Sequence, residues 1–519
     1  MSQFNVAARE SALSVLDGSR ATPTSLIDYQ SNGRVIVIGE DSALAYCRQW
    51  PETSNVTLLS NAGKQVEIEG YLGAFSVELN DSEGSRQSLQ ADIVLDLNPE
   101  PINRNEILPP GYLHARISDE NVADIELQVA ELIGEFEKPK YFNYDPSICA
   151  HSVNGVTVCS RCIDACPAGA IESAGNQIEI TPFLCQGGGT CATVCPSGAV
   201  QYAYPSLADS GNQVRKMLKA YRQAQGEQAV VLFHSGAFSP EALMQQHENI
   251  LPVPVEELAS VGMELCLSAL AYGASQVFLI RDEEVPELSL KNLQRQVDWM
   301  QVLLGNIGFN PRQLGIQSAS DPLSLIDKPT SVEPAIHSMA DGKRNAFYQA
   351  LDHLVARFDC GDVIADLPAG APFGTVVIDE ARCTLCMACI GSCPGRALQD
   401  GSNREVPEVF FIENHCIQCG ACTQTCPEQA ITLVPRLVFG RESRNHSRAL
   451  NRDQPFCCID CGKPFAPSSV IDKMLAQLKD HYMFNSPRAL DRLKMCEDCR
   501  VVDIVQDPEA MKGKFDPLN

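Results

Sequence analysis

Short apolar runs separated by polar connectors dominate the first third of the chain. The runs RVIVIG (34–39), VTLLS (56–60) and ADIVLDL (91–97) are rich in β-branched residues and have the length of buried strands. The segment SALAYCRQW between the first two is helix-like, and KQVEIEGYLGAFSVEL predicts a hairpin. This order predicts a small Rossmann-like α/β domain over 33–140, preceded by a short helix and a polar connector over 1–32.

The turn after the first of these strands lacks the glycine-rich phosphate loop of dinucleotide-binding domains. Gly39 is followed by Glu40, Asp41 and Ser42. Acidic side chains at this turn would repel a pyrophosphate. We therefore expect a structural α/β domain instead of a nucleotide site.

A second α/β pattern spans 211–330. AVVLFH (229–234) and QVFLI (276–280) predict buried strands. The intervening PVPVEELASVGMELCLSALAYGA carries its apolar residues at roughly helical spacing, and ELSLKNLQRQVDWMQVLL (287–304) predicts an amphipathic helix. The segment 317–334 has the proline and serine content of a linker. The remaining predicted domains are a first cysteine-rich module (141–210), a helical linker (331–375), a second cysteine-rich module (376–440) and a four-cysteine element (441–519).

Length and charge bound the class of protein. A chain of 519 residues is too long for one core, and its longest apolar runs are far short of the roughly 20 residues of a membrane span. The N-terminus has no basic region before a long apolar core, so we expect a cytoplasmic protein without membrane insertion. The net charge of −25 argues against nucleic acid as a partner. It fits a protein partner with a basic surface, or simply an acidic soluble protein.

The 23 cysteines change this picture most, because clustered cysteines in a reducing compartment indicate bound metal. The segments CTLCMACIGSCP (383–394) and CIQCGACTQTCP (416–427) both have the complete C-x2-C-x2-C-x3-C-P spacing. In this motif three cysteines bind one cluster, and the fourth, before the proline, binds the other. The predicted [4Fe–4S] ligand sets are Cys383, Cys386, Cys389 and Cys426, and Cys416, Cys419, Cys422 and Cys393. This segment resembles the bacterial-type 2[4Fe–4S] ferredoxin family.

The segment 141–210 resembles a degenerate copy of the same module. CSRCIDACPAGAI has Val156 where the leading cysteine should be, and CQGGGTCATVCP has Gly188 where the second should be. Cys149, ten residues before Cys159, is a candidate replacement ligand. The crossing rule then gives one complete [4Fe–4S] set, Cys149, Cys159, Cys162 and Cys195, and one incomplete set, Cys166, Cys185 and Cys191.

The incomplete set leaves four alternatives open. Loss of the second cysteine is typical of a [3Fe–4S] cluster, or of a [4Fe–4S] cluster whose labile iron takes water or a non-cysteine side chain. The site could also be empty or use an unforeseen protein ligand. His151 is a conceivable ligand, although a lone histidine near a loop is more often structural.

The last cysteines predict a different metal. CCIDCGKPF contributes Cys458 and Cys461, and CEDC contributes Cys496 and Cys499. Two C-x2-C knuckles are typical of a closed four-cysteine zinc site, here a zinc-ribbon-like element with a helix over SSVIDKMLAQLKDHYMF. An iron–sulfur site is the alternative. The cysteines outside the three groups are expected to be buried small hydrophobic residues: Cys47, Cys266, Cys360 and Cys457.

No motif for a nucleophile, a phosphate loop or a catalytic metal accompanies these cysteines, so we predict no catalytic residue and an electron carrier more readily than an enzyme. A third reading, an enzyme acting at the open iron beside Gly188, would need an acid–base group that the loop lacks. The order of elements resembles 4Fe–4S proteins associated with molybdenum- or tungsten-dependent formate dehydrogenases. The stretch 229–280 is similar to the delta subunit of methyl-viologen-reducing hydrogenases and to heterodisulfide reductase A-type subunits, but with Cys266 alone it implies that their [2Fe–2S] cluster is lost. These resemblances imply a polyferredoxin with a redox protein partner, such as a formate dehydrogenase; the alternative is an accessory, assembly or redox-sensing protein.

Overall fold

The computed structural model divides the chain into two compact units. Unit 1 comprises Met1–His151 and Ser160–Asp359, and unit 2 comprises Ser152–Cys159 and Cys360–Asn519. Within the described part, no helix is long and apolar enough to cross a membrane. The described residues are 4–17, 24–48, 50, 55–62, 64–80, 86–153, 155–236, 238–358, 363–401 and 406–508.

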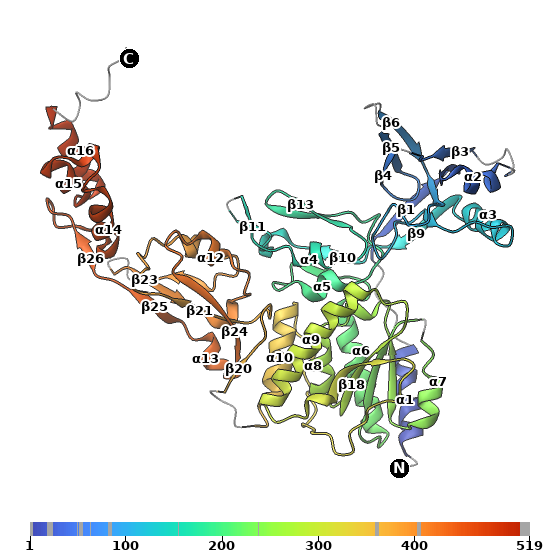
Figure 1. The fold of residues 1–519 in the computed structure, drawn as a ribbon. Helices are drawn as coiled ribbons and strands as arrows, with labels where there is room; N and C mark the ends of the chain where they lie inside the picture. The colour runs from blue at the N-terminus through green and yellow to red at the C-terminus, as the bar shows by residue number, and fades with distance from the viewer. Residues whose placement is uncertain are drawn as a thin grey trace. The chain divides into compact units, whose positions relative to one another are not determined.

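The first α/β domain of unit 1 contains a parallel sheet of order β3-β2-β7-β8 (Figure 1). The three strands predicted from apolar runs are confirmed. Val35 and Val37 face the two helices, whereas Ile36 and Ile38 face an antiparallel sheet β4-β5-β6, as the period of two requires. The elements are β2 (Arg34–Gly39), α2 (Asp41–Cys47), β3 (Asn55–Ser60), β4 (Gln65–Glu69), β5 (Phe75–Asn80), β6 (Arg86–Ala91), β7 (Ile93–Asp96), β8 (Tyr112–His114) and α3 (Val122–Glu131).

The predicted hairpin is confirmed as β4 and β5, which pair antiparallel. The polar connector predicted over 1–32 is wrong in its second half, because β1 (Leu26–Ser31) pairs antiparallel with β9 (Gly134–Pro139). Polar side chains alternate along β1 because one face is exposed, and this alternation hid the strand. The Rossmann-like description of the domain stays a prediction.

The second α/β domain has a parallel sheet of order β17-β16-β18-β19. The helical spacing between the two predicted strands is found in η2 and α8 (Met263–Ala271), but the segment opens with an edge strand, β17, that the apolar pattern did not predict. Pro252 and Pro254 lack an amide hydrogen and suit an edge strand better than a helix interior. The strands are β16 (Val230–His234), β17 (Ile250–Pro254), β18 (Gln276–Arg281) and β19 (Leu314–Ser318), with 3-10 turns η2 (Leu258–Ser260) and η3 (Pro311–Gln313).

Helices cover both faces of this sheet (Figure 1). The N-terminal helix α1 (Phe4–Asp17) packs along α6, and α10 packs along α8. The helix of the linker predicted over 331–375 is therefore α10, one of the helices that cover this sheet. The other helices are α6 (Leu207–Gln223), α7 (Glu241–Gln246), α8 (Met263–Ala271), α9 (Glu287–Asn306) and α10 (Lys343–Val355).

The first cysteine-rich module lies at the carboxyl ends of the β16–β19 strands. Thr193 Oγ1 on α5 donates to the Ala259 carbonyl of η2 at 3.1 Å, and Thr190 Oγ1 lies 2.7 Å from Ser289 Oγ of α9. All four residues are buried. The module's elements are β10 (Phe142–Tyr144), η1 (Pro146–Ile148), α4 (Arg161–Asp164), β13 (Ile171–Ala174), β14 (Gln177–Ile180), α5 (Thr190–Val194) and β15 (Val200–Tyr202).

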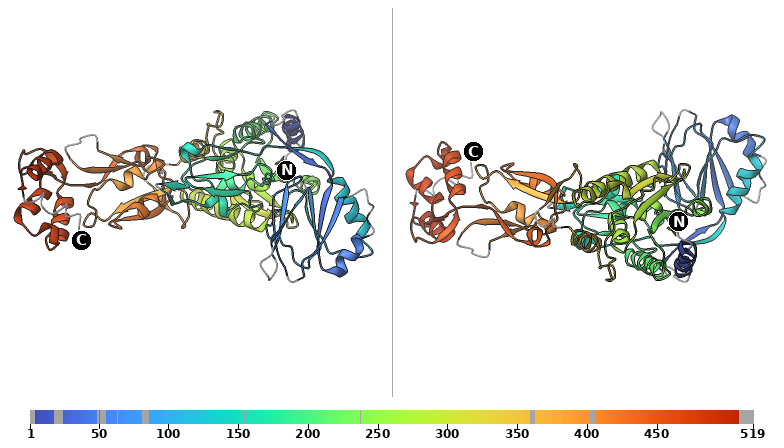
Figure 2. Two further views of the ribbon diagram at one scale, coloured as in Figure 1. Left: turned by 90° about the horizontal axis from the view of Figure 1, so that it is seen from above. Right: turned by 90° about the horizontal axis from the view of Figure 1, so that it is seen from below.

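Unit 2 holds the second cysteine-rich module and the C-terminal element. Its sheets are β20-β24-β21 and β22-β23-β25, and the C-terminal helices lie together in both views of Figure 2. The helix predicted after the first knuckle is confirmed as α14. The elements are β11 (Ser152–Val153), β12 (Val156–Thr157), β20 (Ile364–Asp366), β21 (Gly374–Ile378), α11 (Ala388–Gly391), β22 (Leu398–Asp400), β23 (Glu408–Phe411), η4 (Glu413–His415), α12 (Ala421–Thr425), β24 (Ile431–Val438), α13 (Arg441–Asn445), β25 (Arg448–Arg452), β26 (Pro455–Cys457), β27 (Pro464–Pro467), α14 (Ser468–Leu478), η5 (Tyr482–Phe484), α15 (Pro487–Leu493) and α16 (Glu497–Val505).

Candidate iron–sulfur and four-cysteine sites

Six of the eight cysteines of the second module belong to one hydrophobic core: Cys389, Cys416 and Cys422 are buried in it, and Cys383, Cys393 and Cys426 pack against it. Cys419 is half-buried and Cys386 is exposed. Burial raises the pKa of the Cys422 thiol, and the charges of Cys416 and Cys419 raise it further. Buried thiols crowded in this way ionise readily only when a cation compensates their charge, which is the electrostatic condition for binding iron.

The loops that carry these cysteines share a backbone conformation that residues other than glycine rarely adopt. Leu385 and Met387 have φ of 53° and 61°, and Gln418 and Gly420 have φ of 52° and 89°. These are the second and fourth residues after Cys383 and after Cys416. Alternation of right- and left-handed residues turns successive amide N–H groups into one concavity, where they can donate to sulfide or thiolate.

A second repeated feature follows each Cys-Pro pair. The Ala397 amide donates to Cys393 Sγ at 3.2 Å, and the Ala430 amide donates to Cys426 Sγ at 3.3 Å. The residues before these alanines, Arg396 and Gln429, again have positive φ. The turn therefore aims an N–H group at the sulfur that the motif assigns to the opposite cluster.

Glu413, which sequence reasoning missed, anchors the second loop. It is 4% exposed and accepts two hydrogen bonds from Arg436, at 2.8 Å from Nε and 2.7 Å from Nη2, while Arg448 Nη2 lies 2.9 Å away. The Cys416 amide donates to the Glu413 carbonyl. One buried carboxylate thus ties β24 and β25 to the start of a cysteine loop, a role with no signal in the cysteine spacing.

The Cys185 loop of the first module keeps the same backbone although it lacks one cysteine. Gly187 and Gly189 have φ of 83° and 76°, matching the second and fourth positions of the intact loops. A Cβ atom built at Gly188 would meet only Ile107 Cδ1 at 3.8 Å and Pro167 Cγ at 3.9 Å. The loop therefore has the shape of a cluster-binding loop, with room for a side chain where the cysteine is missing.

The three cysteines of the incomplete set lie close together. Burial raises the pKa of Cys191 well above its usual value, and the charges of Cys185 and Cys166 add to the effect. The Ala170 amide donates to Cys166 Sγ at 3.3 Å, which repeats the turn seen in the second module. The corresponding turn after Cys195 and Pro196 differs. There the Ala199 amide donates to Ser197 Oγ at 3.3 Å.

Cys149, Cys162 and Cys195 share one hydrophobic cluster of unit 1. The pKa of Tyr144 is raised by burial and by its hydrogen bond with Cys149, which places this cysteine beside the module's core. Cys159, the remaining member of the predicted set, belongs to unit 2 and ends the segment of hairpin β11–β12. The pKa of Cys419, also in unit 2, is raised to about 11. Burial is the largest cause, and the charges of Cys393, Cys416 and Cys159 add to it.

His151 has a structural environment. It is 1% exposed, and its Nε2 lies 2.8 Å from Ser173 Oγ of β13. This contact fits the structural role that sequence reasoning favoured. Val156, which stands where the leading cysteine should be, lies in β12 and is 51% exposed.

The last four cysteines form a compact site in unit 2. The Sγ atoms of Cys458, Cys461, Cys496 and Cys499 all lie within 4.8 Å of one another, and those of Cys461 and Cys496 are 3.7 Å apart. Four sulfurs bound tetrahedrally at about 2.3 Å from zinc would be roughly 3.8 Å apart. Burial opposes ionisation of Cys458, but amide N–H groups of Cys461, Cys496 and Asp460 outweigh it and lower the pKa of its thiol to about 6.

The cysteines outside these sites divide into three cases. Cys47 and Cys266 are buried, as predicted. Cys457 is exposed, so the prediction of a buried small hydrophobic residue is wrong there; β26 ends at this residue, and it is the next residue, Cys458, that is buried in the four-cysteine site. Cys360 lies outside the described residues.

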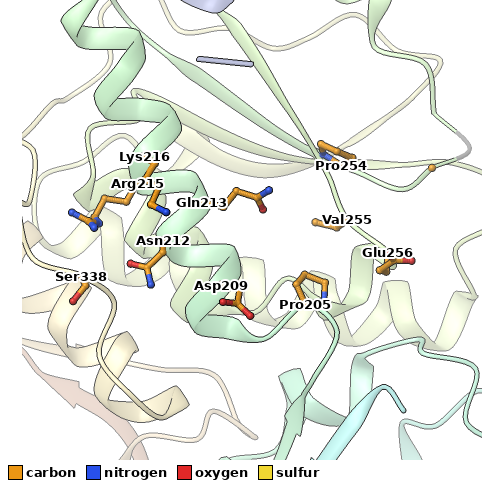
Figure 3. Close-up of a pocket in the computed structure, with 11 residues that line it drawn as sticks. Pro205, Asp209, Asn212, Gln213, Arg215, Lys216, Pro254, Val255, Glu256 and Ser338 are labelled. Carbon is orange, nitrogen blue, oxygen red and sulfur yellow. The ribbon is translucent and has the colours of Figure 1, made fainter. Parts of the chain in front are cut away.

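Unit 1 also has an open cavity of about 720 Å³ beside the module, at the ends of β16 and β17. Figure 3 shows Asp209, Asn212 and Lys216 of α6 on one side and Glu256 on the other. Acidic and basic side chains are mixed here. No cysteine is among the described residues that line this cavity.

Comparison with known families identifies two matching segments. Residues 382–431 and 157–199 each match a 4Fe–4S dicluster domain. No curated protein matches the chain. The chain is thus a mixed α/β multidomain protein with two ferredoxin-like 4Fe–4S domains and a C-terminal four-cysteine cluster, which suggests an iron–sulfur electron-transfer protein.

We expect Gly189→Ala to loosen the first module from the α/β domain. Its Cβ would lie 2.6 Å from Ser260 Cα, and φ is positive, so we expect a loss of about 2–4 kcal/mol in unfolding free energy. The matched control is Gly188→Ala in the same loop, where the added atom has only ordinary contacts and the expected change is within about 0.5 kcal/mol. Denaturant unfolding followed by far-ultraviolet circular dichroism measures both. Equal effects of the two variants would contradict this account.

Proposed function

We propose that this chain is a polyferredoxin that relays single electrons to or from an oxidoreductase. The proposal rests on one observation above all: the Cys185 loop keeps the positive-φ pattern of the intact loops although Gly188 has replaced a cysteine. A loop that had lost its cluster would have no reason to retain two left-handed residues around an open position. The incomplete module is therefore proposed to hold a cluster.

The proposed ligand sets follow the crossing rule. One [4Fe–4S] cluster takes Cys149, Cys159, Cys162 and Cys195, and two more occupy the second module. Cys166, Cys185 and Cys191 hold either a [3Fe–4S] cluster or a site-differentiated [4Fe–4S] cluster, in which one iron has a ligand other than cysteine. The exposed Cys386 marks a cluster edge that a partner could approach.

The proposed partner is a cytoplasmic redox protein. A formate dehydrogenase is the specific candidate, and its support is the order of cysteine elements along the chain. The net charge of −25 favours a partner with a basic face and an association that weakens with salt. The alternative is an accessory, assembly or sensing protein, in which clusters are delivered or destroyed instead of reduced reversibly.

An anaerobic redox titration of the full chain separates these roles. We expect about fifteen to sixteen irons per chain if four clusters are bound, against about eight if the first module is empty. Electron paramagnetic resonance should show every cluster reduced and reoxidised without iron loss, with mediators that cover the roughly −700 to +450 mV range of such clusters. Transfer of iron and sulfide to an apo-ferredoxin during the cycle would instead favour assembly.

Restoring the missing cysteine tests the incomplete site. In Gly188→Cys the new side chain has room, so the site should gain a fourth thiolate and hold a complete [4Fe–4S] cluster. The paramagnetic signal that an oxidised [3Fe–4S] cluster gives should disappear, with about one more iron per chain. Gly188→Ala should keep the wild-type signal. An identical iron content and oxidised-state spectrum in Gly188→Cys would contradict a [3Fe–4S] cluster at this site.

The C-terminal site is proposed to hold zinc in a closed, structural role, because four thiolates leave the ion no open position. Cys499→Ser should remove one zinc per chain and leave iron unchanged. Cys457→Ser is the matched control, since this exposed cysteine stands outside the group of four. Metal analysis by mass spectrometry measures both. Loss of iron from Cys499→Ser would mean an iron–sulfur site instead.

A further inference from the structure

Lys343 occupies an unusual position beside the first module. It is the first residue of α10, and its ammonium donates to main-chain carbonyls at the end of α5. Nζ lies 2.8 Å from the Ala192 oxygen and 3.2 Å from the Cys195 oxygen, and it also contacts the Thr193 oxygen. All three protons of the ammonium thus have acceptors within the turn that leads into Cys195.

This placement runs against local preferences. A cation at the N-terminus of a helix opposes the helix dipole, and an ammonium removed from water loses its hydration. Burial lowers the pKa of Lys343, while the charges of Glu264 and Cys195 favour its charged form. Departures from local rules are expected mainly where they serve a function.

An acidic partner faces the same space. Glu264, in the first turn of α8, and Lys343 both line a cavity of about 310 Å³ whose wall also includes Ala192 and Thr193 of α5. Glu264 is 5% exposed, and its Oε2 has no hydrogen-bond partner among the described residues. Groups of both signs therefore lie near the Cys195 turn. Lys343 contacts it, and so does Arg344, whose Nη1 donates to the Pro196 carbonyl at 3.3 Å. Glu264, whose pKa burial raises and the charge of Lys343 lowers, lies across a cavity.

Such charges affect a cluster because its net charge changes when it gains or loses an electron. Reduction adds one negative charge, so a fixed cation nearby stabilises the reduced state and a fixed anion destabilises it. Charge near the ligands is one of the protein's means of setting cluster potentials. The interior screens these interactions less than water does.

We propose that Lys343 raises the reduction potential of the cluster that Cys195 ligates, and that Glu264 partly offsets this effect. Lys343 acts as a positioning and electrostatic residue, not as a ligand. The inference deepens the proposed function, because it requires a reducible cluster at the Cys195 site. The α/β domain thereby takes part in electron transfer, because its helices α8 and α10 carry Glu264 and Lys343.

Potentiometric titration followed by electron paramagnetic resonance tests the inference on the full chain. Lys343→Met should move one midpoint potential to a more negative value, and Glu264→Gln should move the same midpoint to a more positive value. Lys216→Met is the control, because it removes an exposed lysine from the neighbouring cavity of Figure 3 and should leave every midpoint unchanged.

The two opposite shifts separate electrostatics from structural damage. Shifts of the same sign in Lys343→Met and Glu264→Gln, or no shift in either, would overturn the inference. If Lys343→Met fails to hold its clusters, Glu264→Gln decides alone: a raised midpoint supports the inference, and an unchanged one rejects it. If the wild-type chain shows only the two clusters of the second module, the proposed function fails at the first module and the inference fails with it.

Discussion

The concentration of thiols around small buried volumes is the constraint on which the rest of this molecule depends. Each ligand set needs its sulfurs to converge, yet burial and mutual repulsion raise the pKa of thiols such as Cys191 and Cys422. Only cationic iron and inward-facing amides relieve this conflict. The left-handed residues of the cysteine loops and the N–H···S turns after Cys166, Cys393 and Cys426 supply those amides, even where Leu385 or Arg396 must adopt a conformation that costs an ordinary residue about 1–2 kcal/mol.

The same constraint explains why the modules are attached to larger domains. A ferredoxin module of this size has little apolar core of its own, because cysteines and loops occupy its centre. In unit 1 the module uses the carboxyl ends of a parallel sheet, the edge where open α/β folds commonly bind ligands. Thr190 and Thr193 of α5 make buried hydrogen bonds there, and Gly189 allows the backbone to approach Ser260. On its other side Phe183 stacks on Tyr71, with ring centres 4.4 Å apart, and its carbonyl accepts from Tyr29.

The sequence predicted the features that depend on local pattern. β-branched runs located β2, β3, β7, β16 and β18 because a buried parallel strand needs apolar residues on both faces. Cysteine spacing located both dicluster domains and the four-cysteine cluster, because metal ligands must fall at fixed separations. The features that the sequence did not predict also have physical reasons. β1 was missed because its polar residues face solvent, and β17 because two prolines interrupt its apolar run. Cys457 and Cys458 are neighbours in sequence, but Cys457 is exposed whereas Cys458 is buried within the four-cysteine site.

What no pattern could reveal is the electrostatic environment, since charges that act on one site come from distant segments. Glu413 is matched by Arg436 and Arg448 from two strands, and Lys343 lies nearly 150 positions from the carbonyls that it contacts. Lys343 has the spacing of an ordinary surface lysine in an amphipathic helix, and Glu264 that of an ordinary first-turn acid. Their significance arises only because tertiary packing removes both from water beside a cysteine turn. In an acidic chain of net charge −25, the cations of Lys343 and Arg344 beside this turn would counter locally the repulsion that an arriving electron meets from the rest of the molecule.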